Sequence, residues 1–142
     1  MTMAPDEPSE DAGLTPDDGD EVHVLIVDDD EETREYLTFK LGQQYSVAAV
    51  ADGEECLEYL DDFDTPFPDV MTLDLMMPKV DGYEILEAIA SHDWYADVSP
   101  IVVTGMNQEE NLTRAFQLGA ADFVRKPISI EELRIRIERL LQ

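Results

Sequence analysis

The sequence predicts an α/β domain made of five consecutive β-α units, in which a doubly wound, five-stranded parallel sheet carries helices on both faces. Three observations predict this class. Short apolar runs alternate with helical patterns from residue 22 to residue 142. The runs are nearly continuous in their apolar character, which is typical of strands that are buried on both faces. The connections are short, and no internal repeat is evident.

The expected strands are brief apolar segments. The first reads Val-His-Val-Leu-Ile-Val and suits a central strand of a parallel sheet. The third stops at an aspartate, the fourth stops at a threonine, and the fifth is only a short aromatic and β-branched pair. In chain order, the expected strands are residues 22–27, 46–50, 70–73, 100–103 and 123–124.

Each expected helix has a recognisable start, end or apolar stripe. An acidic run at 28–32 precedes the first helix, as the helix dipole favours, and Gly42 is expected to end it. Ser129 is the predicted N-cap of the last helix, in a capping box with Glu132. The residues expected to face the core are Tyr36, Leu37 and Leu41 in the first helix, and Cys56, Leu57 and Leu60 in a second helix at 53–63. They are Ile85, Leu86 and Ile89 in a third helix, which Asp81 and Gly82 open, and Leu133, Ile137 and Leu140 in the last helix. A further helix is expected at 109–118, with Gly119 as its cap. Residues 65–68 and 91–98 are expected to be loops.

The N-terminal segment differs in composition from the rest. Residues 1–21 hold eight acidic residues, no basic residue and three prolines. Such a segment has almost nothing to bury, so we expect a disordered acidic tail ahead of a single domain at 22–142. The segment lacks the basic and apolar regions of a secretory signal, and no apolar run is long enough to cross a bilayer. We therefore expect a cytoplasmic protein.

Acidic residues dominate the charge of the chain. There are 34 acids against 9 bases, for a net charge of -25. A surface this negative repels phosphate backbones and anionic lipids, so direct binding to nucleic acid or to a membrane is not expected. An acid-rich, lysine-poor composition also favours a halophile source adapted to high internal salt, with an acidic, soluble mesophile protein as the alternative. The single cysteine, Cys56, excludes an intrachain disulfide and is expected to be a packing residue.

Polar residues follow the expected strands. Asp28 and Asp29 follow the first strand, Asp74 the third, Thr104 the fourth and Lys126 the fifth. The carboxyl ends of parallel strands share one edge of the sheet, which is where such domains place their functional sites. The sequence therefore predicts that three carboxylates, a hydroxyl and an ammonium group converge.

This set of groups suits phosphoryl chemistry. Converging carboxylates repel one another unless a cation joins them, and Mg²⁺ prefers a few carboxylates together with phosphate oxygens. A carboxylate can also act as the nucleophile and form an acyl phosphate. Lys126 is suited to pair with the phosphoryl oxygens, and Thr104 can donate a hydrogen bond to one of them. A bond that forms only when the phosphate is present is the basis of a switch.

Four short motifs resemble those of response-regulator receiver domains of two-component signal transduction. They are Val27-Asp28-Asp29, Asp74-Leu75-Met76-Met77-Pro78 with Asp81-Gly82, Val103-Thr104-Gly105, and Lys126-Pro127. Each is weak alone, but they occur in order across residues 22–142. The resemblance implies a flavodoxin-like (βα)5 fold similar to that of CheY. It also implies a phosphoprotein that catalyses nothing beyond its own phosphorylation and dephosphorylation.

The resemblance also implies residue roles. Asp74 would accept a phosphoryl group from a histidine kinase or a phosphotransfer protein. Asp28, Asp29, Asp74 and the backbone carbonyl of Met76 would hold Mg²⁺. Thr104 and Lys126 would bind the phosphoryl group, with Phe123 as the aromatic switch residue and the Lys126-Pro127 bond in the cis form.

Partners follow from the same resemblance. A downstream protein would dock on the last two helices and the fifth strand. Because no output domain follows the last helix, the chain is either a stand-alone receiver or a fragment. A homodimer is a further possibility, in which the arginines of the last helix pair with the preceding helix of the other copy; these residues are Arg134, Arg136, Arg139, Glu109 and Glu110.

Other function classes fit less well. A phosphatase with an aspartate nucleophile would need a second acid at the position of Met76, and a nucleotide-binding enzyme would need a glycine-rich phosphate loop. A receiver that docks without being phosphorylated remains an alternative. Met76 and Met106, two residues after Asp74 and Thr104, are apolar and cannot orient an attacking water. We therefore expect the phosphoryl group to be lost slowly.

Overall fold

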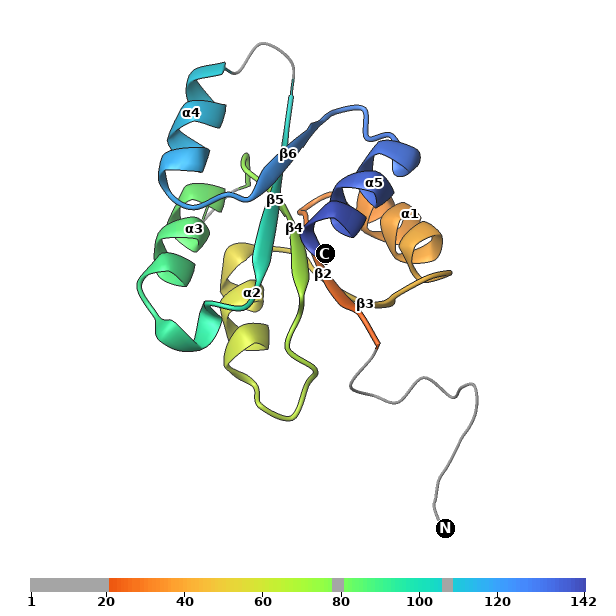
Figure 1. Ribbon diagram of the computed structural model, residues 1–142, viewed down its shortest axis with the longest axis horizontal. Coiled ribbons are helices and arrows are strands. Elements are labelled where there is room, and N and C mark those ends of the chain that lie inside the picture. The colour runs from red at the N-terminus through yellow and green to blue at the C-terminus, as the bar shows by residue number, and fades with distance from the viewer. Residues whose placement is uncertain (1–20, 78–80, 106–108) are drawn as a thin grey trace.

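A parallel sheet of five strands forms the centre of the molecule (Figure 1). The computed structural model describes residues 21–77, 81–105 and 109–142. The strand order is β3-β2-β4-β5-β6. The chain therefore adds β3 on one side of β2 and then places β4, β5 and β6 in succession on the other side. The strands are β2 (His23–Val27), β3 (Ser46–Val50), β4 (Val70–Asp74), β5 (Ser99–Thr104) and β6 (Asp122–Arg125). The expected (βα)5 fold class is thereby confirmed.

Helices cover both faces of the sheet because side chains alternate between the faces along each strand. In β2, Leu25 and Val27 enter one core cluster, whereas Val24 and Ile26 enter the other. α2, α3 and α4 pack on the first cluster, and α1 and α5 pack on the second. The helices are α1 (Glu31–Leu41), α2 (Gly53–Asp61), α3 (Gly82–Ala90), α4 (Glu109–Gln117) and α5 (Ile130–Leu140).

Side-chain caps fix the starts of four of the helices. Asp30, Asp52, Asp81 and Ser129 each accept a hydrogen bond from a backbone N–H in the first turn. Each such cap stabilises a helix by about 1 kcal/mol. The reciprocal capping box forms at Asp81, whereas at the predicted box of Ser129 the structure shows the serine half, a bond of 3.2 Å from the backbone N–H of Glu132.

Two glycines end helices in different ways. Gly119, at φ 111°, adopts the left-handed conformation that favours glycine at a helix end, as predicted. Gly42 also ends its helix, but in a right-handed conformation at φ -65°.

Three local predictions were wrong. Tyr36 is 48% exposed, because α1 packs on the sheet through Leu37 and Leu41. α2 ends at Asp61, because Asp62 is extended, and Phe63 is 85% exposed in the loop that follows. The expected loop at 91–98 contains a 3-10 helix, η3 (Asp93–Tyr95), which buries Tyr95.

Two further predictions concern the acidic tail and a membrane-spanning helix. The expected acidic tail lies, apart from Glu21, outside the described residues. Within the described part of the chain, no helix has the length and apolar character that a bilayer crossing requires.

Candidate functional site

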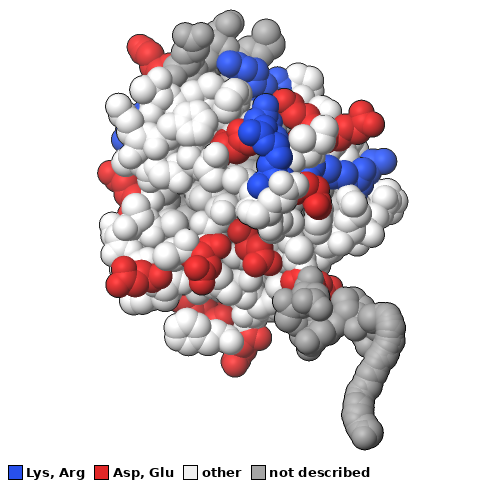
Figure 2. All heavy atoms as spheres, in the orientation of Figure 1, with Lys and Arg blue, Asp and Glu red and all other residues white. Residues whose placement is uncertain are grey.

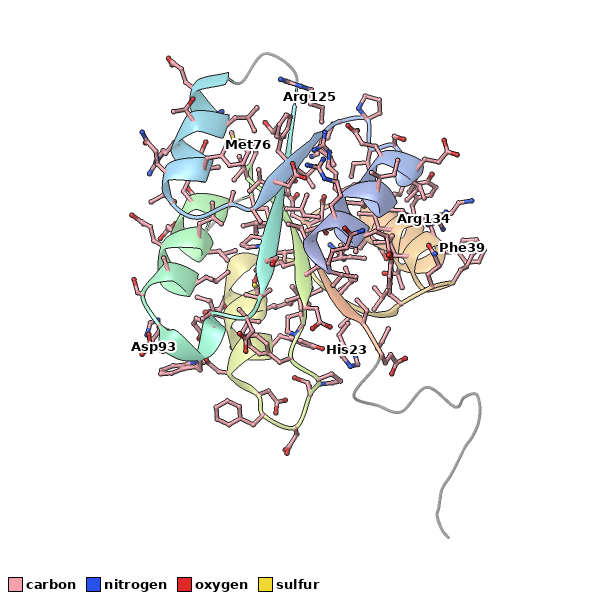
Figure 3. The ribbon with its side chains drawn as sticks, in the orientation of Figure 1. His23, Phe39, Met76, Asp93, Arg125 and Arg134 are labelled. Carbon is pink, nitrogen blue, oxygen red and sulfur yellow. The ribbon has the colours of Figure 1, made fainter. Side chains whose placement is uncertain are left out.

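The strand register brings all five predicted site residues to one edge of the sheet. β2 and β4 run in register up to Val27 and Leu73, so Asp28 and Asp74 emerge side by side. Thr104 is paired with Arg125, and the backbone N–H of Lys126 donates to the carbonyl of Thr104 at 2.8 Å. Figure 3 shows Met76 and Arg125 at this end of the molecule, whereas Asp93 and His23 lie at the other end.

Three carboxylates converge at this edge. One oxygen from each of Asp28, Asp29 and Asp74 lies within 4.8 Å of the others. Asp28 is 2% exposed and Asp74 is 3% exposed, whereas Asp29 is exposed to solvent. Burial, and next the negative charge of Asp74, raise the pKa of Asp28, although a hydrogen bond from the backbone N–H of Asp30 opposes the shift. The negative charges of Asp28 and Asp74 thus lie close together at a buried position, where water screens them only partly.

Asp74 is held by both of its oxygens. The backbone N–H of Met76 donates to Oδ1 at 3.0 Å, and the Lys126 ammonium group donates to Oδ2 at 3.1 Å. Partial burial disfavours the charged form of Lys126, but the bond to Asp74 and the neighbouring carboxylates outweigh it and raise its pKa. The carboxylate is therefore fixed in orientation, and the lysine stays charged beside it.

The loop that carries Asp28 has a support that the sequence did not reveal. The Arg34 guanidinium donates to the carbonyl oxygen of Asp28 at 2.9 Å, and the Asp30 N–H donates to Asp28 Oδ1 at 2.9 Å. The Asp28 N–H donates to Val50 on β3 at 3.2 Å. A basic residue one turn after a run of acids was the available signal for Arg34.

Gly82 supports the loop after Asp74. Its N–H donates to the carbonyl of Leu75 at 3.3 Å, and a Cβ on this glycine would stand 2.8 Å from the Leu75 Cα. Only a residue without a side chain allows α3 to begin this close to the backbone. The Asp-Gly pair of the sequence therefore both caps α3 and positions the loop of the phosphoacceptor candidate.

Thr104 and the following loop complete the edge. Thr104 is 1% exposed at the end of β5, and its hydroxyl lies 3.4 Å from the carbonyl of Gly105. The Lys126-Pro127 peptide bond is cis, as predicted. Met76 is 60% exposed beside Asp74, whereas Met77 is buried. Met106, the second predicted apolar flank, lies outside the described residues.

Phe123 lies on β6 among aromatic and cationic groups. Its ring meets Phe116 of α4 edge-on, with the ring centroids 6.0 Å apart. The guanidinium carbons of Arg136 and Arg125 lie 5.4 Å and 5.5 Å from the ring centroid. Arg136 is fixed in turn by salt bridges of 2.7 Å to Asp122 and 3.2 Å to Glu132. These contacts hold Phe123 half-buried and join α4, β6 and α5.

The donor set fits a hard divalent cation. It offers two buried carboxylates and one exposed carboxylate, against which Lys126 supplies one positive charge. Oxygen ligands of this kind, with an open side toward solvent, suit Mg²⁺ better than a soft metal. Asp28, Asp29 and Asp74 are thus the residues able to hold such an ion.

Comparisons with known proteins agree with this geometry. The family model described as "Response regulator receiver domain" matches residues 24–138. The Guillardia theta protein ycf27 is 39% identical over 120 residues, which cover 84% of this chain and 45% of that protein. The response regulator SaeR of Staphylococcus aureus is 37% identical, over 84% of this chain and 50% of that protein. The chain thus spans about half the length of these curated relatives.

Solved structures show the same fold. The chemotaxis protein CheY4 of Vibrio cholerae is 27% identical, with a TM-score of 0.77 over 84% of this chain and 98% of that one. The receiver domain of the Francisella response regulator 1452 is 28% identical, with a TM-score of 0.74 over 84% and 95% of the two chains. With the family model covering most of its length, this chain belongs to the response regulator receiver domain family.

Proposed function

We propose that Asp74 accepts a phosphoryl group from a phosphohistidine, in a reaction that requires Mg²⁺, and that this modification switches the domain's surface toward a partner protein. The observation that carries the proposal is the environment of Asp74. This buried carboxylate is fixed by Met76 and Lys126 and lies beside the carboxylates of Asp28 and Asp29. A carboxylate that served only as a turn residue would account for the bond from Met76, but not for the burial, the pairing with Lys126 or the two neighbouring carboxylates.

The transfer breaks one bond and forms one. A carboxylate oxygen of Asp74 bonds to phosphorus, the phosphorus–nitrogen bond of the donor imidazole breaks, and the released imidazole takes up a proton. Mg²⁺, when bound, would neutralise charge on the phosphoryl oxygens. Lys126 is placed to pair with one of these oxygens, since it already pairs with Asp74 at 3.1 Å. Thr104, at the end of the neighbouring strand, would donate its hydroxyl to another.

The donor would approach over a groove beside Lys126. This groove has a volume of about 500 Å³ and lies between the start of α1 and the loop after β6. Tyr36, one of its lining residues, is 48% exposed there. An aromatic ring next to the entry of a phosphoryl site offers apolar contact to a docking helix. We propose that a histidine kinase or phosphotransfer protein binds at this groove.

The output would pass through Phe123. In the proposed switch, Thr104 moves toward the phosphoryl group and the ring of Phe123 turns into the space that Thr104 leaves. The ring contacts Phe116, Arg125 and Arg136, so its movement would alter the surface formed by α4, β6 and α5. A downstream protein, or a second copy of the chain, would bind that surface. Arg136 is already paired within the chain, which leaves Arg134 and Arg139 for the pairing predicted between copies.

Treatment with acetyl phosphate tests the assignment. The wild-type chain should gain the mass of one phosphoryl group with Mg²⁺ and none with a chelator. Asp74→Asn should gain none, and the exposed carboxylate of Asp97, at the opposite end of the sheet, provides the matched control Asp97→Asn, which should behave as wild type. If the folded wild-type chain stays unmodified with both acetyl phosphate and a phosphorylated histidine donor, the proposal fails and the unphosphorylated docking module is favoured.

A further inference from the structure

The positive charges of this acidic chain gather at its C-terminal end. Residues 122–142 hold five basic and four acidic residues, a net charge of +1, whereas residues 1–121 hold four bases and 30 acids, a net charge of -26. Figure 2 shows the basic side chains gathered over β6 and α5 with some acidic side chains among them, while further acidic groups are scattered over the otherwise mostly uncharged remainder of that view. This face is where a negatively charged partner would meet least repulsion.

Three of these arginines have no carboxylate partner among the described residues. Arg125 and Arg139 are exposed. Arg134 is half-buried and donates to the backbone carbonyl of Lys40 at 2.8 Å. Among the described residues, the salt bridges near these arginines are those that Arg136 makes with Asp122 and Glu132. Lys126 makes its salt bridge with Asp74, at the carboxylate edge. We call Arg125 of β6, Arg134 and Arg139 of α5, and the exposed Ile135 of α5 the arginine face.

Residues 1–20 have the complementary charge. They contain seven acidic residues and no basic residue. They join the domain near the C-terminal end of α5, which carries Arg139, because Val22 and Leu140 pack on the same core cluster; Arg125 lies at the opposite end of the molecule from His23 (Figure 3). A flexible chain of 20 residues would span about 25 Å on average, and α5, of 11 residues, is about 16 Å long. The segment is therefore long enough to lie along the whole of α5.

We propose that the arginine face binds the acidic segment 1–20 of the same chain. Tethering gives the segment an effective concentration in the millimolar range, which a separate partner must exceed. A second copy would instead bring a body of net charge -25 against another of the same charge. Insofar as the proposed function is right, the segment competes with the downstream target for this surface. Because exposed charges are screened by salt, the contact weakens as ionic strength rises.

Paramagnetic broadening in the full-length, unphosphorylated chain tests the proposal. A spin label on Ser9→Cys places the probe in the segment, and Cys56 does not compete for the label because it is fully buried. At low salt, the amide signals of Ile135, Arg136 and Leu140 should be lost. The amides of Glu58 on α2 and Glu87 on α3, in the opposite helix layer, should keep theirs.

Two variants separate charge recognition from accidental proximity. Arg125→Gln with Arg139→Gln removes two exposed guanidinium groups and should restore the lost signals, as should multimolar KCl. Arg114→Gln removes an exposed arginine of α4 outside the face and should leave the signals lost. Signals that persist in the wild-type chain, or a loss that the double variant does not reverse, would overturn the proposal.

A mixed sample identifies the source of the contact. Isotope-labelled chain without the spin label is combined with spin-labelled chain at natural isotope abundance. Signals on α5 should then be retained, and their loss would assign the face to a second copy and overturn the intramolecular contact. The experiment needs no phosphodonor, so a failure of Asp74 to become phosphorylated would leave its result intact.

Discussion

Replacing Asp28 by asparagine should stabilise the metal-free domain. Two unit charges 4.8 Å apart repel by about 3.5 kcal/mol at an effective dielectric constant of about 20, and by about 0.9 kcal/mol in water. The Lys126 charge offsets part of the repulsion that Asp28 experiences from Asp29 and Asp74. Asparagine keeps the side-chain oxygen that accepts from the Asp30 N–H. We therefore expect a gain of roughly 1–2 kcal/mol in the free energy of unfolding.

Urea unfolding with a chelator and with Mg²⁺ measures this effect. In chelator, Asp28→Asn should unfold at a higher urea concentration than the wild type, and Asp97→Asn should match the wild type. Saturating Mg²⁺, at about a hundred times its dissociation constant, should add about 2.7 kcal/mol to the wild type and little to the variant. A variant that is no more stable than the wild type in chelator, or one that Mg²⁺ stabilises equally, would refute the reasoning.

The same charge cluster predicts a pH dependence. The folded-state pKa of Asp28 is raised above its ordinary value of 3.8, so the folded state binds its proton more tightly than the unfolded state. Its contribution to stability is thus complete below that value and is lost as the pH rises through the raised pKa. In chelator, the stability advantage of Asp28→Asn should grow over this window. Mg²⁺ binding should weaken over the same window as the pH falls, because protons compete for the carboxylate.

Three further substitutions test particular contacts. Met76→Asn should shorten the lifetime of the phosphorylated chain roughly tenfold, since a polar group beside Asp74 can orient an attacking water. The rate at which inorganic phosphate is released measures this lifetime, and an unchanged lifetime would contradict the role of the exposed methionine. Gly82→Ala should lower the free energy of unfolding by roughly 1–3 kcal/mol, as measured in urea, because the new Cβ would lie 2.8 Å from the Leu75 Cα. A loss no larger than that of an ordinary surface substitution would show that the loop can move aside without strain. Tyr45→Phe should cost about 1 kcal/mol, because the buried hydroxyl donates to Glu138 of α5 at 2.5 Å. If Tyr45→Phe costs nothing further once Glu138→Ala has removed the acceptor, that bond is the source of the effect; an equal cost in both backgrounds would contradict it.

The sheet and its order of elements were predictable because strands buried on both faces must be apolar at nearly every position. β4 illustrates this, since all five of its residues are buried. The sequence also located the site, because the strand-end rule needs only the strand boundaries and the residue types that follow. Asp28, Asp74 and Lys126 were predicted to converge on that basis, and they do.

Details that depend on helix rotation were not predictable. Tyr36 and Leu37 are adjacent apolar residues, and periodicity alone did not show that α1 turns the first toward solvent and the second toward the sheet. Phe63 continued an apolar pattern past the point where Asp62 leaves the helix. In the site, the bond from Arg34 to the Asp28 carbonyl depends on the loop conformation that follows β2. Short-range pattern contains no information about such a loop.

The stacking of Arg125 and Arg136 on Phe123 has a consequence for background signalling. Each cation–π contact at an exposed site contributes about 0.5–1 kcal/mol, so two of them would favour the present, half-buried position of the ring by about 1–2 kcal/mol. Such a difference corresponds to a factor of about 5–30 between the two ring positions. If the proposed switch operates, these two arginines set how often the unphosphorylated domain adopts its active form by chance. Their substitution would raise the noise of the pathway without touching the phosphorylation chemistry.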